Sequence, residues 1–220
     1  MARRGRLRAR PSSILPLVSD ERGAKRDPTP LRGPFAARSA ATKRRILWVA
    51  GAVALAIWVF LFIQDSEIKD SGGPGIIGFE VAGTEKEAEE ILEEWGAQGS
   101  DDARVSIYAD FPYLIAYSIF LAVGCTIASE RLGRRGMTSL ARLGPLLGWS
   151  MFAAAAFDAI ENVAMLRVID SHTATWPGIA LYAAIPKFAI AALGIAYVIA
   201  GAVLGRGGRE KDPKPAAGGA

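Results

Sequence analysis

The chain has 220 residues, of which 51% are hydrophobic, yet it carries a formal net charge of +4. A single cysteine, Cys125, and a single histidine, His172, exclude an intramolecular disulfide and argue against a structural zinc site or a Cys–His nucleophile. Because the apolar residues gather in four long runs with the charges between them, we predict one all-α membrane domain with no metal and no cofactor.

The N-terminal segment, residues 1–45, is strongly basic, with thirteen Lys and Arg against three Asp and Glu. It lacks apolar periodicity, which predicts a disordered cytoplasmic tail. We expect this tail to contact anionic lipid headgroups of the bilayer. Nucleic-acid binding by the run Arg3–Arg10 is the less favoured alternative. Residues 206–220 are rich in Gly, Pro, Lys and Ala, and predict a second disordered cytoplasmic tail.

The predicted fold is a polytopic four-transmembrane-helix bundle over residues 46–205. The expected spans are about 46–63, 111–128, 143–166 and 179–204. The first span ends without a small-residue cleavage pattern, so it predicts an uncleaved anchor. Lys and Arg are frequent in the N-terminal tail, the second loop and the C-terminal tail, and rare in the other loops. This alternation predicts a multi-pass plasma-membrane protein with both termini cytoplasmic.

The loop at residues 65–110 is expected outside the cell, and it contains thirteen Asp and Glu against three Lys and Arg. Residues 76–81 are expected to be extended or interfacial. Thr84 and Glu87 have the spacing of a capping box, and they begin a predicted extracytoplasmic amphipathic helix that ends near Gly96–Gly99. Its apolar stripe is formed by Ala88, Ile91, Leu92 and Trp95. No calcium-loop motif accompanies its acidic face, which we interpret as a solvated surface.

A group of polar residues lies inside the third apolar run. Asp158, Glu161 and Asn162 are spaced i, i+3 and i+4, so on a helix they share one face. Lipid cannot solvate that face, and an ionised Asp at mid-membrane costs about 2.5 kcal/mol or more. We therefore expect these side chains to point into the protein interior or a wet cavity.

A depth argument adds partners from the other helices. Asp158 and Lys187 each lie about eight residues from the outer end of their span, which is roughly 12 Å at 1.5 Å per residue. We predict a buried ion-pair cluster of Lys187 with Asp158 and Glu161. The supporting candidates are Asn162, one of Tyr113 or Tyr117, and Asp110 at the outer mouth. One lysine cannot neutralise three carboxylates, so at least one of them is expected to be protonated or to face water.

Two interpretations of this cluster remain open. Polar residues between membrane helices can fix helix register, which would make the chain a structural or interaction component. Alternatively, the cluster is the site of a small membrane-embedded enzyme or of a proton-linked binder of a lipid or amine. A cavity that reaches the cluster would favour the second interpretation. The sequence leaves the reaction, the ligand and the oligomeric state undefined.

Several short elements together resemble a group of small uncharacterised bacterial four-helix membrane proteins. They are Phe79-Glu80-Val81-Ala82, Trp95, Asp110-Phe111, Tyr117 and Asp158 with Glu161-Asn162. The resemblance covers roughly residues 76–190 and implies a similar four-helix bundle. It implies no activity, and the Arg-rich N-terminus looks like an addition to that group.

Overall fold

The computed structural model describes residues 31–171 and 175–205. Within these ranges the chain forms five helices: α1 (Ala40–Asp70), α2 (Ile76–Glu80), α3 (Glu85–Arg134), α4 (Thr138–Ser171) and α5 (Thr175–Leu204). All except α2 are long and apolar enough to cross a membrane. The expectations for residues 1–30, for His172 and for residues 206–220 lie outside the described residues and stay predictions.

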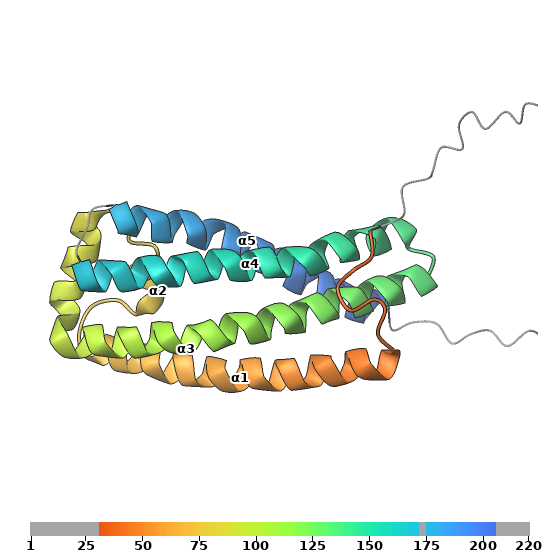
Figure 1. The fold of residues 1–220 in the computed structure, drawn as a ribbon, viewed down its shortest axis with the longest axis horizontal. Coiled ribbons are helices and arrows are strands. Elements are labelled where there is room, and N and C mark those ends of the chain that lie inside the picture. Colours follow the sequence, from red (N-terminus) through yellow and green to blue (C-terminus); the bar gives the residue numbers. More distant parts are fainter. Residues whose placement is uncertain (1–30, 172–174, 206–220) are drawn as a thin grey trace, which may run out of the picture. The chain divides into compact units, whose positions relative to one another are not determined.

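The four long helices run alternately up and down, with α2 and the start of α3 at one end (Figure 1). Residues 31 and 205 lie at the opposite end (Figure 1). Helix α4 packs against both α3 and α5, and α5 also packs against α3. Helix α1 packs along α3, and no comparable packing joins α1 to α5 in the described part of the chain. This arrangement leaves room beside α3 between α1 and α5.

The first helix begins earlier than the predicted span, at Ala40, because the Ser39 side chain accepts a hydrogen bond from the Thr42 backbone N–H and caps it. Residues 31–39 also differ from the expected disorder, since they fold back on the bundle. The Thr126 hydroxyl donates to the Pro34 carbonyl at 2.7 Å, and the Trp149 indole N–H donates to the Arg32 carbonyl at 3.0 Å. The N-terminal boundary of the ordered domain therefore lies before the predicted residue 46.

Helix α3 begins with the predicted capping box, in which Thr84 and Glu87 satisfy each other's backbone N–H groups. Its first turns lie across the end of the bundle (Figure 1) and bury Ala88, Leu92 and Trp95. The chain then turns at Gly96, whose φ of 60° is accessible to glycine at little cost. The helix resumes directly afterwards, so the second long helix starts well before the predicted residue 111.

Residues 76–80 form the short helix α2 instead of the expected extended segment. Three contacts hold it in place. The Ile76 N–H donates to Asp65 Oδ1 at 2.7 Å, and the Trp95 indole N–H donates to the Pro74 carbonyl at 2.6 Å. The Phe79 ring packs on Trp95 with centroids 4.9 Å apart. These contacts seat α2 against α3, α4 and α5, and bury Glu80 at its last residue.

Candidate functional site

The centre of the site is Lys187, which lies on α5 and is only 8% exposed. Its ammonium nitrogen is 2.7 Å from Glu161 Oε2 and 3.1 Å from Asp158 Oδ1, both on α4. A third carboxylate, Glu80 of α2, places Oε2 at 3.6 Å. Three carboxylates therefore lie within ion-pair distance of the single positive charge of Lys187.

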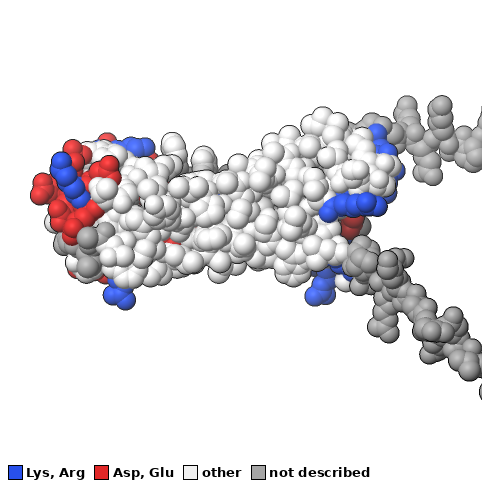
Figure 2. Space-filling view, turned by 90° about the horizontal axis from the view of Figure 1, so that it is seen from above, with Lys and Arg blue, Asp and Glu red and all other residues white. Residues whose placement is uncertain are grey.

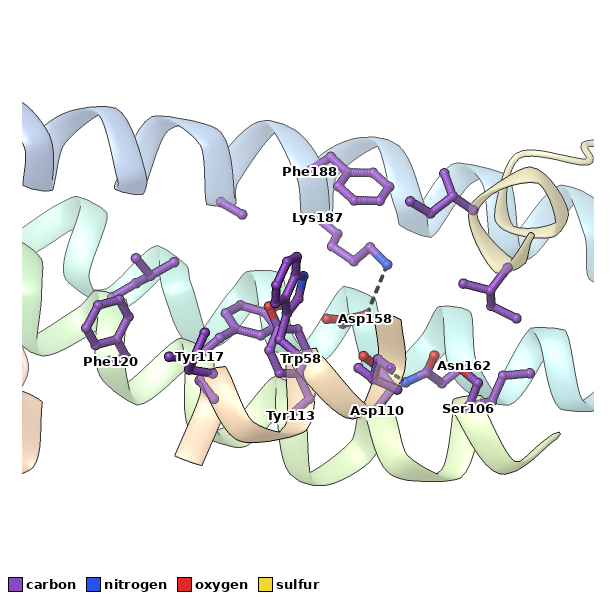
Figure 3. A pocket seen from close by; sticks show the side chains of 18 of the residues that line it. Trp58, Ser106, Asp110, Tyr113, Tyr117, Phe120, Asp158, Asn162, Lys187 and Phe188 are labelled. Carbon is purple, nitrogen blue, oxygen red and sulfur yellow. Dashed lines mark hydrogen bonds and ion pairs between the residues drawn. The ribbon is translucent and has the colours of Figure 1, made fainter. Parts of the chain in front are cut away.

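A second polar pair lies beside this group and joins α3 to α4. The Asn162 amide N–H donates to Asp110 Oδ2 at 2.7 Å. No lysine or arginine of the described residues forms an ion pair with Asp110. Figure 3 shows Asp110 and Asn162 next to each other, with Lys187 directed from α5 toward Asp158.

The structure brings the sequence-predicted residues to one region, with differences in detail. Lys187 contacts Asp158 and Glu161 as predicted. Asn162 was expected to support the ion pairs of Lys187, but its side chain donates a hydrogen bond to Asp110. Tyr113 and Tyr117 pack against each other with ring centroids 5.3 Å apart and ring planes tilted by 52°, and the Tyr117 hydroxyl has no hydrogen-bond partner among the described residues.

Glu80 is the member of the cluster that the sequence interpretation missed. It lies in residues 76–81, which were expected to be extended or interfacial, so it was not included in the predicted cluster. The available signal was its position as the only charged residue between Pro74 and Glu85, in a segment that is otherwise apolar, glycine or threonine. Burial raises the pKa of the Glu80 carboxyl above its ordinary value, although the nearby Lys187 opposes this shift.

A cavity of about 890 Å³ opens beside the cluster. Its polar wall is formed by Glu80, Asp110, Asp158, Asn162 and Lys187. The remaining lining is mainly apolar or aromatic. Most of it comes from α1, α3 and α5, including Trp48, Trp58, Leu55, Phe120, Phe188 and Ile195. The labelled residues of Figure 3 show this division, with Tyr117 and Phe120 at one side and Asp110, Asn162 and Ser106 at the other.

Some groups in this region have no polar partner. Glu161 is fully buried, and its Oε1 meets no hydrogen-bond donor. The Tyr117 hydroxyl, on a residue that is 9% exposed, also has no hydrogen-bond partner, and Tyr117 lines the cavity. Such groups are rare in folded proteins and call for an explanation. Within the described residues, no group of three or more His, Cys, Asp and Glu side chains is placed to hold a metal ion.

This arrangement can bind a polar group and an apolar chain at the same time. Carboxylates accept hydrogen bonds or hold a cation, and Lys187, Asn162 and Tyr117 donate. The apolar walls accommodate hydrocarbon. Pockets of roughly 300–1,000 Å³ with a few convergent polar groups are typical of small-molecule sites.

The fold and the site together define an all-α protein with four helices that are long and apolar enough to cross a membrane. Comparisons with known protein families, curated proteins and solved structures find no match to this chain. The geometry of the cluster and its cavity is therefore the basis for assigning a function.

Proposed function

We propose that this chain is an integral membrane protein that binds an amphipathic, lipid-like molecule in the cavity between α1, α3 and α5. The observation that carries the proposal is the cavity itself, because its apolar walls meet the buried polar cluster along one side. Packing that served only to fix helix register would leave no such space, since protein interiors are normally filled to close-packed density.

The position of α1 supports entry of the ligand from the bilayer. Helix α1 packs along α3, and among the described helices it has no comparable packing against α5. The cavity lining includes Trp48 and Trp58, whose side chains are 75% and 49% exposed on the same helix. A molecule dissolved in the bilayer could therefore pass between α1 and α5 without crossing water.

The charge distribution supports the proposed placement in a bacterial plasma membrane. Acidic side chains gather at the α2 end of the bundle, and Lys and Arg mark the opposite end (Figure 2). Exposed large hydrophobic side chains such as Val53, Leu55 and Ile199 cover the middle. By the positive-inside rule, the end with residues 31 and 205 would be cytoplasmic and the cluster would lie toward the outer side. Membership in the group of bacterial four-helix membrane proteins is part of this proposal.

A structural role is the second candidate, and a specific observation favours it. The ion pairs of Lys187 connect α5 with α4 and α2, which is how polar residues fix helix register in membranes. The two roles differ in one expectation: a structural cluster does not need the adjacent cavity to stay open.

Filling the cavity tests the proposal directly. Ala191 of α5 lines the cavity, whereas its neighbour Ala192 is exposed and does not. The full-length protein in micelles is titrated with three compounds that share one brominated alkyl chain: an amine, an alcohol and a fatty acid. Bromine quenches the fluorescence of nearby tryptophans, and Trp48 and Trp58 both line the cavity.

We expect saturable quenching by at least one compound. Ala191→Phe should weaken it about tenfold or more, and the matched control Ala192→Phe should leave it unchanged. Quenching that does not saturate with any compound, or that is identical in Ala191→Phe, would contradict the proposed function.

A further inference from the structure

We propose that the cavity is specific for an amphipathic molecule with a protonated amine head, which Asp110 binds. This inference deepens the proposed function and depends on it. It assigns the chemical class of the ligand and the residues that select it.

The cavity wall contains more carboxylates than cations. Among the described residues that line the cavity, Lys187 is the one cation, while Glu80, Asp110 and Asp158 are carboxylates. Lys187 directs its ammonium to Asp158, Glu80 and the fully buried Glu161. Lys187 forms no ion pair with Asp110, so among the described residues the wall lacks a cation at that position.

Within the described part of the chain, Asp110 has one carboxylate oxygen without a hydrogen bond. Its Oδ2 accepts a hydrogen bond from Asn162, which leaves Oδ1 with no bond from any described residue. Asp110 is half-buried and belongs to the cavity lining, so its carboxyl group borders the cavity. A carboxylate in an apolar cavity is costly without a positive partner, and an ammonium from the ligand would supply it.

An independent observation comes from Tyr117. Its hydroxyl is buried, lines the same cavity and has no hydrogen-bond partner. Asp110, Tyr113 and Tyr117 are spaced i, i+3 and i+7, so α3 presents them along one face. With the amine head beside Asp110, the unpaired Tyr117 hydroxyl offers the bound molecule a second polar contact in the same cavity.

Aromatic rings complete the recognition. Tyr113 and Tyr117 pack against each other with their rings tilted by 52°, and Trp58 of α1 lines the same cavity. Cations are attracted to the faces of such rings, most strongly to tryptophan. The cavity already contains one contact of this kind, because the Lys187 ammonium lies 4.6 Å from the centre of the Phe188 ring. The apolar side near Phe120 and Ile195 would receive the hydrocarbon chain.

The comparison of the three brominated compounds separates this inference from the proposed function. We expect the amine to bind more tightly than the alcohol and the fatty acid, at a pH at which the amine is protonated. Asp110→Asn keeps an oxygen for the Asn162 hydrogen bond but removes the charge. It should weaken amine binding about ten- to hundredfold and change alcohol binding little, because charge-assisted hydrogen bonds are the stronger class.

Two further variants complete the test. Asp110→Glu retains the charge and should retain the preference for the amine. Tyr117→Phe should weaken amine binding by a factor of about ten or less, as expected for one neutral hydrogen bond. Thermal unfolding of each variant confirms that the comparison is made on folded protein.

The outcomes are distinct. If none of the three compounds binds saturably, the proposed function fails. If the alcohol or the acid binds as tightly as the amine, or if folded Asp110→Asn binds the amine like the wild type, the amine inference is wrong while the proposed cavity function stands.

Discussion

Two buried lysines in this bundle have very different surroundings. Lys43 of α1 is 5% exposed and pairs with one carboxylate of the described residues, Glu130 of α3. Lys187 is 8% exposed and contacts three carboxylates, with Asp110 also nearby in the cavity wall. The first lysine has a balanced partner, and the second has an excess of negative groups.

The two sites also differ in how far water can solvate their charges. The pair of Lys43 and Glu130 joins α1 to α3, and the Glu130 side chain is 34% exposed, so water shares in its solvation. Glu161 is fully buried and the Asp158 side chain is 5% exposed, so water solvates their carboxylates very little. One balanced pair is enough to link two helices. An excess of buried carboxylates beside a cavity costs folding free energy, which is consistent with a site that serves binding.

The largest expected effect is that of Lys187→Met. Removing the cation leaves Asp158, Glu161 and Glu80 close together without a positive partner, which typically costs about 3–5 kcal/mol for a buried pair. Thermal unfolding in detergent should show a much lower midpoint than that of the wild type. Lys43→Met is the matched comparison and should cost less, because partly exposed Glu130 can be solvated. Equal losses in the two variants would remove the distinction between the sites.

A smaller effect is expected when the balanced pair loses its acid. Glu130→Gln leaves Lys43 buried without its carboxylate, at a cost on the order of 2 kcal/mol. The control is Glu90→Gln, which removes an exposed carboxylate 3.6 Å from Lys86 on the surface of α3. That variant should change stability by less than about 0.5 kcal/mol. If Glu130→Gln were as stable as its control, the flexible Lys43 side chain would be able to move its ammonium group into water.

Helical periodicity and depth were sufficient to find part of the site. Asp158, Glu161 and Asn162 share a face because of their spacing, and Lys187 was matched to them by counting residues from the span ends. Both arguments are local to a helix, which is why they could be made from the sequence. The four long apolar helices were predictable for the same reason, since each run is continuous in the chain.

The remaining features depend on contacts between distant residues. Glu80 reaches the cluster because Asp65 and Trp95 hold the segment around α2, and no local pattern encodes those contacts. The cavity exists because α1 packs on α3 without comparable packing against α5. This arrangement is a property of the whole bundle. Lys43 was included in the basic tail at residues 1–45, since its partner Glu130 is far away in the chain.

The smallest and most specific expected effect concerns Glu80→Gln. Because burial raises the pKa of Glu80, the folded protein holds this proton more tightly than the unfolded chain does. The resulting stabilisation is fully present below the ordinary value of 4.5 and is lost as the pH rises through the raised value. Lys187, Glu161 and Asp158 all face Glu80 and influence this titration.

Gln has nearly the same shape as protonated Glu, so the variant should match the wild type within about 0.5 kcal/mol at acidic pH. As the pH rises, the wild type should lose stability relative to Glu80→Gln, and unfolding curves recorded across the pH range would show the two midpoints separating. Glu130→Gln, at the balanced site, should show no such gain. If Glu80→Gln were instead less stable than the wild type at neutral pH, Lys187 would need all three carboxylates, and the cluster would be a balanced structural unit after all.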